Sequence, residues 1–394
     1  MRKGWEYKKL GEVATFINGD RGKNYPSAKD FVESGVPFIN AGHLNNGIIS
    51  YDKMNYITIN KYNSLGSGKI IKNDILFCLR GSLGKYAIVA EDSMGAIASS
   101  LVIIRPFQNA DNRFIAHFLS SAKIKEYIAK NNNGSSQPNL SAKSVASFII
   151  PLPTLSTQLA IVSELDKINE LIRLKKEQLK DFDNLAQSLF FEMFGDPVEN
   201  EKGWEVKKLN EIVSDNCSIS YGIVQPGDGV ENGVPVVRPV DMTKTFVSRK
   251  GLKNTTKEIS DSYKRTILKG NEILMCVRGT TGLISMATPE LQGCNVTRGI
   301  APIECGPTCD KWFVFYQILN PAIQHHIAEY TRGIALKQIN MKDVRDIPLC
   351  LPPLSLQRLF AQRIEQIERE KSEVQKSIQD LETLLASRMQ YWFE

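Results

Sequence analysis

Residues 66–69, Gly-Ser-Gly-Lys, are the first candidate for chemistry, because they resemble a phosphate-binding loop. Such a loop needs a glycine five positions before its second glycine and a Ser or Thr after the lysine. This sequence has Asn63 and Ile70 at those positions. We therefore interpret the segment as a turn before a strand.

Cysteine and histidine pairs are the next candidates. Cys305 and Cys309, with Cys294 nearby, could supply thiolates to a metal, but His325 and His326 stand outside zinc-finger spacing. We expect buried thiols and a turn. No Ser, Cys or carboxylate pattern typical of a catalytic triad accompanies the other two histidines, His43 and His117.

An enzyme would need a motif that this sequence does not offer. We find no dinucleotide fingerprint, and residues 320–323, Asn-Pro-Ala-Ile, do not match the Asn-Pro-Pro-aromatic motif of a methyltransferase. The sequence therefore predicts a protein without catalytic residues, metal site or cofactor of its own. A nuclease or methyltransferase fused to its own reader is the alternative that these absences disfavour.

A repeated turn offers groups that could bind nucleic acid. Arg-Gly-x-x-Gly follows an apolar run at Arg80–Gly84 and again at Arg278–Gly282. Its glycines permit close approach of a backbone, and the arginine with Ser82, Thr280 or Thr281 could donate hydrogen bonds to phosphates. The alternative is a tight turn whose arginine pairs with a nearby carboxylate.

Two polar loops in each half carry the side-chain types that read base edges and phosphates. They are residues 18–25 and 131–143 in the first half, matched by 220–226 and 331–338. Loops that only face solvent have the same composition. The loops at 131–143 and 331–338 could instead fix a domain to its long helix. We predict that the DNA-contacting residues are Arg21, Lys23, Asn24, Tyr25, Arg80, Ser82, Lys85, Gln137, Asn139, Tyr221, Gln225, Arg278, Thr280, Thr281, Arg298, Lys337 and Gln338.

These candidates recur because the chain is a tandem duplication. Residues 4–12, GWEYKKLGE, return as GWEVKKLNE at 203–211, identical at all but Tyr7 and Gly11. The strand and turn beginning at Ile75 return 198 positions later at Ile273. Leu-Pro-x-Leu-Ser-x-Gln occurs at 152–158 and again at 351–357.

Each half is predicted to contain an α+β domain of about 150 residues followed by a long helix. Strands are expected at 75–79 and 100–104 and a helix at 113–130, and Ser156 and Ser355 are the expected N-caps of the long helices. The expected segments are recognition domains at 1–153 and 196–352 and long spacer helices at 154–195 and 353–394.

Apolar residues on each long helix follow the 3-4 spacing of a coiled coil, interrupted by Lys175 and Lys371. A helix of about 40 residues is about 60 Å long, so the connection between the halves favours antiparallel pairing, with pseudo-twofold symmetry and the domains at opposite ends. Double-stranded DNA has a similar twofold axis. The residues predicted to pair the helices are Leu165, Ile168, Ile172, Leu179, Phe182, Leu189, Ile364, Ile367, Val374, Ile378, Leu381 and Leu385.

Composition fits this interpretation without deciding it. The 394 residues carry a formal net charge of +6, which is compatible with a polyanionic partner but is a mild excess. Seven cysteines, an odd number with no CxxC pair, favour reduced thiols. Without a signal peptide or a long apolar run, the expected location is the cytoplasm, with no membrane contact.

Taken together, the chain resembles the specificity subunit (HsdS) of type I restriction-modification systems over its whole length. The resemblance rests on the duplicated Gly-Trp-Glu-x-Lys-Lys-Leu opening, the Arg-Gly-x-x-Gly turns and the Leu-Pro-x-Leu-Ser-x-Gln entry into each helix. Because the chain stops at Phe393-Glu394 with no tail, the sequence casts doubt on closure of the C-terminus onto the first domain.

The resemblance implies two domains that each read one half of a bipartite, asymmetric site in double-stranded DNA, with the helices setting the spacer. It also implies docking of two methyltransferase subunits, which restriction-translocase subunits can join. AdoMet, ATP and Mg²⁺ would belong to those partners. The competing hypothesis is a coiled-coil scaffold that binds only protein.

Overall fold

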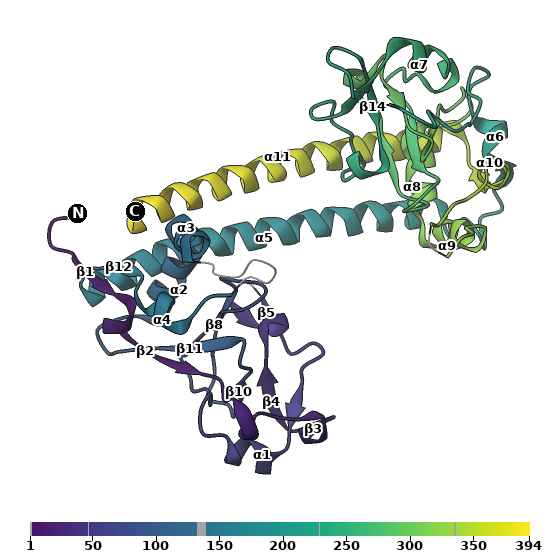
Figure 1. The fold of residues 1–394 in the computed structure, drawn as a ribbon. Helices are drawn as coiled ribbons and strands as arrows, with labels where there is room; N and C mark the ends of the chain where they lie inside the picture. The colour runs from purple at the N-terminus through teal and green to yellow at the C-terminus, as the bar shows by residue number, and fades with distance from the viewer. Residues whose placement is uncertain (1, 46, 132–138, 228, 335) are drawn as a thin grey trace. The chain divides into compact units, whose positions relative to one another are not determined.

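The computed structural model describes residues 2–45, 47–131, 139–227, 229–334 and 336–394. The chain divides into two compact units (Figure 1). Unit 1 consists of residues 1–176 and 376–394, and unit 2 consists of residues 177–375. Each unit combines a mixed domain of helices and strands with parts of both long helices, which confirms the predicted α+β fold.

The first half of the chain supplies the following elements. Its strands and α-helices are β1 Glu6–Lys9, β2 Ala14–Asn18, β3 Phe31–Val32, β4 Val36–Ile39, β5 Leu44–Asn45, β6 Ile48–Ile49, β7 Tyr56–Ile57, α1 Ile59–Ser64, β8 Ile75–Cys78, β9 Tyr86–Ile88, β10 Ala96–Ile97, β11 Leu101–Pro106, α2 Asn112–Ser120, α3 Ala122–Asn131, α4 Ala142–Ala146, β12 Ile149–Leu152 and α5 Leu155–Phe194.

The second half repeats the order with fewer strands. Its elements are β13 Glu205–Lys208, α6 Leu209–Ile212, β14 Val234–Val237, β15 Lys253–Thr255, α7 Lys257–Asp261, β16 Ile273–Cys276, β17 Ile284–Met286, β18 Asn295–Val296, β19 Ile300–Ile303, α8 Lys311–Leu319, α9 Pro321–Glu329, α10 Met341–Arg345, β20 Pro348–Leu351 and α11 Leu354–Phe393.

Each unit contains a sheet with a completely buried strand, beside a second sheet of the same number of strands, β10-β4-β7-β3 in unit 1 and β15-β14-β18 in unit 2. The sheet with the buried strand has the order β2-β11-β8-β9 in unit 1 and β17-β16-β19 in unit 2. All residues of β8 and of β16 are buried, which explains why both strands are continuous apolar runs. Leu101 lies opposite Cys78 and Ile300 lies opposite Cys276, so the central register is the same in both units.

The repeated opening and closing motifs of each half pair with one another. β1 runs antiparallel to β12, with Glu6 opposite Leu152, and β13 runs antiparallel to β20, with Glu205 opposite Leu351. The Gly-Trp-Glu-x-Lys-Lys-Leu segment therefore lies beside the strand that leads into the long helix. This pairing brings the start and end of each repeat together.

Two details of the predicted helices are wrong. The helix expected at 113–130 is two helices, α2 and α3, because Ser121 is extended and ends the first. Ser156 and Ser355 lie in the first turns of α5 and α11 and do not cap them. Thr154 occupies the cap of α5, where its hydroxyl accepts a hydrogen bond from the Thr157 amide at 3.4 Å.

A fully buried glutamine attaches each long helix to its domain. The Gln158 carboxamide accepts a hydrogen bond from the Asp111 amide at 2.9 Å and donates to the carbonyls of Pro153 and Asn109 at 2.9 and 3.1 Å. Asp111 in turn caps α2. This side chain therefore fixes α5 to the start of α2.

Unit 2 repeats this attachment at the equivalent positions. Gln357 accepts from the Asp310 amide at 2.9 Å and donates to the Pro352 carbonyl at 2.7 Å. Asp310 caps α8, the counterpart of α2. The glutamine of the Leu-Pro-x-Leu-Ser-x-Gln motif is thus a buried structural anchor in both units.

The long helices pair antiparallel within each unit, as predicted. In unit 1, Lys176 of α5 bonds Glu382 of α11 at 2.8 Å, and Glu164 pairs with Arg388 nearer the other end of each segment. In unit 2, Lys371 lies 2.8 Å from Asp183 and 2.7 Å from Glu368. Burial alone would lower the pKa of Lys371, but these two carboxylates outweigh it and raise that pKa.

The residues predicted to pair the helices face inward to differing extents. Seven of them are buried and five are half-buried. The buried ones are Leu165, Ile168, Ile172, Ile364, Ile367, Val374 and Ile378, and the half-buried ones are Leu179, Phe182, Leu189, Leu381 and Leu385.

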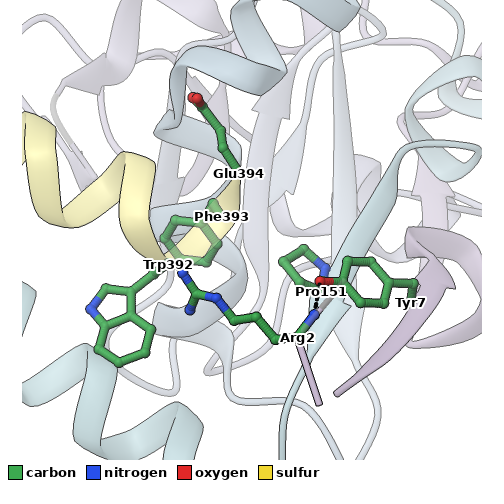
Figure 2. A pocket seen from close by; sticks show the side chains of 6 residues that line it. All are labelled: Arg2, Tyr7, Pro151, Trp392, Phe393 and Glu394. Atoms are coloured by element: carbon green, nitrogen blue, oxygen red, sulfur yellow. Dashed lines mark hydrogen bonds between the residues drawn. The ribbon is translucent and has the colours of Figure 1, made fainter. Parts of the chain in front are cut away.

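The C-terminal end of α11 closes onto the first domain, contrary to the doubt that the abrupt end of the sequence raised. Phe393 is 1% exposed and its ring lies 5.3 Å from that of Phe114. Trp392 stacks on Trp5 at 6.1 Å, and the Arg2 guanidinium lies 5.1 Å from the Trp392 ring (Figure 2). Residues of the last turn of α11 provide this contact.

We predict that Gln357→Ala lowers the free energy of unfolding by about 1–3 kcal/mol, because the Asp310 amide and Pro352 carbonyl lose their buried partner. Urea unfolding followed by circular dichroism measures this change. Gln362→Ala is the matched control, because Gln362 is exposed on the same helix. Equal unfolding midpoints for the two variants would refute the anchoring role.

Candidate nucleic-acid interface

The Arg-Gly-x-x-Gly turn follows the buried central strand in both units. Its four glycines have positive φ angles, +77° and +83° at Gly81 and Gly84 and +90° and +85° at Gly279 and Gly282. A Cβ added to Gly81 or Gly279 would meet no atom within 4 Å. The backbone conformation, and not crowding, therefore requires these two glycines, and the tip of each turn is open to a ligand.

A buried thiol holds the arginine at the start of each turn. Cys78 Sγ donates to the Arg80 carbonyl at 3.1 Å, and Cys276 Sγ donates to the Arg278 carbonyl at 3.2 Å. Burial raises the pKa of both thiols, so they stay protonated and can donate. The two arginine side chains consequently start from the same backbone position in the two units.

The structure brings part of a second predicted loop beside this turn. Arg80 forms a β-bridge with Asn139, and the Leu140 amide bonds the Leu79 carbonyl at 2.9 Å. Arg278 forms the same bridge with Gln338, while the Gly279 amide donates to the Lys337 carbonyl at 2.8 Å. Lys337 is exposed beside the turn. Gln137 lies outside the described residues.

In unit 2 the predicted loop at 220–226 also lies beside the turn. Gln338 Nε2 donates to Tyr221 Oη at 3.3 Å, and the Arg298 guanidinium lies 5.9 Å from the centre of the Tyr221 ring. The Val277 amide bonds the Gly299 carbonyl at 2.8 Å, which places Arg278 and Arg298 at neighbouring strand ends. We call Tyr221, Arg278, Arg298 and Gln338 the unit 2 cluster.

The remaining predicted residues of unit 2 lie around this cluster. Thr280 is exposed on the turn, and Thr281 Oγ1 lies 3.1 Å from Thr331 Oγ1. Gln225 is exposed on the loop that follows Tyr221. Residues from four separate stretches of the sequence, around Tyr221, Arg278, Arg298 and Gln338, therefore meet at one end of the β16 and β19 strands.

The two arginines of the unit 2 cluster carry uncompensated charge. Both are half-buried, and no carboxylate pairs with either of them among the residues that the structure describes. The Arg278 Nε atom is buried without a hydrogen-bond acceptor in that same part of the chain. By contrast, Arg238 pairs with Asp241 at 2.7 Å, and Asp74 accepts a hydrogen bond from Arg105 at 2.7 Å. Neighbouring unpaired guanidinium groups favour a polyanion.

Unit 1 presents a more open version of this surface. Arg80, Ser82 and Lys85 are exposed on the turn, and Asn139 is exposed beside it. Arg80, like Arg278, has no carboxylate partner in the described ranges. The alternative in which this arginine simply neutralises a nearby carboxylate therefore finds no support in either unit.

The predicted 21–25 loop of unit 1 does not join that surface through any described contact with Arg80. Arg21 and Lys23 are exposed, and Asn24 is half-buried. The Tyr25 ring packs edge to face on Phe38 at 5.7 Å, against the buried residues around β4. Tyr25 thus has a structural role that its residue type did not reveal.

Sequence reasoning missed the residue of unit 1 that corresponds to Arg298. The Leu101 amide bonds the Ala98 carbonyl and the Ile300 amide bonds the Thr297 carbonyl, so Ser99 occupies the place of Arg298. The correspondence between Ser99 and Arg298 is hard to recognise in the sequence, because the offset between the halves is 198 residues at the turn and 199 residues at this strand.

The described ranges contain neither a metal-binding cluster nor a membrane-spanning helix. No three His, Cys, Asp or Glu side chains are grouped so that they could hold a metal ion. None of the described helices combines the length and apolar character that crossing a membrane requires.

The chain consists of two tandem copies of a known DNA specificity domain. The family model for the type I restriction modification DNA specificity domain matches residues 2–181 and again 201–383. The chain belongs to this family, and it is a non-catalytic specificity subunit of type I restriction-modification systems with two recognition domains.

Individual relatives are distant. The EcoBI specificity subunit of Escherichia coli is 24% identical, and the match covers 68% of this chain and 61% of that protein. The MjaVIII specificity subunit of Methanocaldococcus jannaschii is 22% identical, with 97% and 92% covered. A chain solved in a study of assembly and conformational transition of the type I R-M system has a TM-score of 0.60 at 20% identity, over 99% and 97% of the two chains, which shows a shared fold.

We predict that Arg80→Ala and Arg278→Ala each weaken binding to duplex DNA, whatever its sequence, because each removes an unpaired cation from the turn. The slope of log binding constant against log salt concentration should fall by about one for each arginine that contacts a phosphate. Fluorescence anisotropy with a labelled duplex at several salt concentrations measures both effects. Arg363→Ala, an exposed arginine on α11, is the control. Unchanged affinity and slope in both turn variants would refute a phosphate contact.

Proposed function

We propose that each unit reads one half of a bipartite, asymmetric site in double-stranded DNA. The observation that carries this proposal is the repeated turn, whose arginine has no carboxylate partner among the described residues of either unit and has different neighbours in the two. A phosphate backbone has the same chemistry at both half-sites, whereas the bases differ. Because the arginine is the same in both units but the residues around it differ, two different half-sites are a better explanation than a palindromic site.

The paired helices would set the distance between the two half-sites. Each helix has 40 residues, so it is about 60 Å long and would correspond to a spacing of one to two turns of B-DNA, at about 34–36 Å per turn. Ion pairs join the two helices within each unit, Lys176 with Glu382 in unit 1 and Lys371 with Asp183 in unit 2. The buried Gln158 and Gln357 fix each domain to its helix.

Two methyltransferase subunits are the proposed direct partners, with restriction-translocase subunits joining through the complex in the cytoplasm. Leu185 of α5 and Leu384 of α11 occupy equivalent positions, 199 residues apart, and are 52% and 46% exposed. A partner that covers one of these leucines would find a second copy of the same feature on the other helix. The duplication therefore supports two copies of one partner. The chemistry of AdoMet, ATP and Mg²⁺ would reside in those partners.

A coiled-coil scaffold without DNA specificity is the competing function. The long helices and their exposed leucines are compatible with it. A scaffold gives no reason, however, for an arginine that lacks a carboxylate partner in the described part of the chain to recur at an open glycine turn in both units. We therefore favour DNA recognition.

The chain should be combined with the methyltransferase subunit encoded beside it and incubated with AdoMet and a random-sequence duplex library. Single-molecule sequencing then maps the methylated positions. We expect methylation at one split motif with two different half-sites, and none when this chain is omitted. Complex formation with no motif, and with no salt-sensitive DNA binding, would favour the scaffold.

A further inference from the structure

The two units can be aligned by their hydrogen bonds, because the same bonds recur around each turn. The Ala98 amide bonds the Ile39 carbonyl and the Thr297 amide bonds the Val237 carbonyl, at 2.8 and 2.9 Å. Together with the Arg80 and Arg278 bridges, these bonds identify equivalent positions without reference to any other protein. The shared positions can then be separated from the changed ones.

Three positions around the turn carry different side chains in the two units. Asn139 beside Arg80 corresponds to Gln338 beside Arg278. Ser99 corresponds to Arg298 through the strand hydrogen bonds. The third pair is Asn18 and Tyr221. Each precedes a glycine that packs on the equivalent strand of its unit, Gly19 against Ile97 of β10 and Gly222 against Val296 of β18.

On the basis of the proposed function, we propose that Arg298 reads a guanine in the half-site of unit 2, while Arg278, shared with unit 1 as Arg80, contacts phosphate. A residue that both units retain cannot distinguish two different half-sites, whereas a residue that differs can. Arginine is suited to guanine because its guanidinium donates two hydrogen bonds to O6 and N7 in the major groove.

The surroundings of Arg298 orient it for such a contact. Its guanidinium lies 5.9 Å from the Tyr221 ring centre, and Tyr221 Oη is held by Gln338 Nε2 at 3.3 Å and by the Ile339 carbonyl at 3.5 Å. An aromatic face beside a guanidinium limits its conformations without using its N–H donors. No carboxylate among the described residues competes for those donors. Tyr221 is thus a positioning residue for Arg298.

Unit 1 lacks this arrangement. Ser99 has a single hydroxyl that can donate or accept and does not select guanine in the way that a guanidinium does. Asn18, in the place of Tyr221, offers no aromatic face. The guanine preference is therefore a property of unit 2 alone.

The test is methylation mapping on the random duplex library with the assembled complex, for wild type, Arg298→Lys, Arg298→Ser and Arg278→Ala. Lysine keeps the charge but loses the two-pronged geometry. We expect Arg298→Ser to reduce the preference for guanine by about tenfold or more at one position of one half-site, and Arg298→Lys to reduce it at the same position by a smaller factor, because an ammonium still donates to O6 and N7. The half-site read by unit 1 stays unchanged and serves as an internal control for folding. Arg278→Ala should lower methylation without changing the motif.

The outcomes separate this inference from the proposed function. A wild-type complex that yields no split motif contradicts the proposed function itself. A wild-type split motif that both Arg298 variants leave unaltered overturns the inference alone, as does loss of base preference in Arg278→Ala. If Arg298→Ser abolishes methylation altogether, the motif of Arg298→Lys is the test: a weakened preference for guanine supports the inference, and an unaltered motif overturns it.

Discussion

Attachment of two long helices to two small domains depends in each case on one uncharged, completely buried side chain. Gln158 and Gln357 each join a helix to the cap of the domain's own helix, at Asp111 and Asp310. A carboxamide can accept and donate at once, which a carboxylate or an ammonium cannot do. Burying it with its partners satisfied gives a directional connection that apolar packing alone would not specify. The packing of Ile161 and Val162 of α5 and of Phe360 and Ala361 of α11 into the domain cores acts together with this contact to set the direction of each helix.

Much of the architecture could be predicted from the sequence because the chain repeats itself. The periodic spacing of Leu165, Ile168 and Ile172 and the equivalent series near Ile364 predicted helix pairing, and the strands at Ile75 and Ile273 stood out as apolar runs. The division of the 113–130 segment at Ser121 could not be seen, since α2 and α3 have continuous helical character and the break depends on how the two pack. Likewise Gln158 was visible as part of a motif but not as a buried residue.

The interface was harder to predict than the fold for a physical reason. Polar residues on loops obey no periodicity, so residue type was the main guide. That guide identified Arg278, Tyr221 and Gln338, which the structure gathers, but it also selected Tyr25, whose ring packs on Phe38. It could not align Ser99 with Arg298, because the loops between the shared strands differ in length. Tertiary hydrogen bonds supply that alignment.

The packing of Phe393 against Phe114 has a consequence for how the protein is made. Unit 2 is one continuous stretch, residues 177–375, whereas unit 1 needs residues 376–394 to fill its core. During synthesis the first domain emerges first, yet the aromatic side chains that complete it leave the ribosome after the whole of unit 2. In unit 2 the corresponding place is taken by Phe194, which packs on Phe313 and precedes that domain in the chain. The half that is translated later therefore has its full set of core residues before the half that is translated earlier.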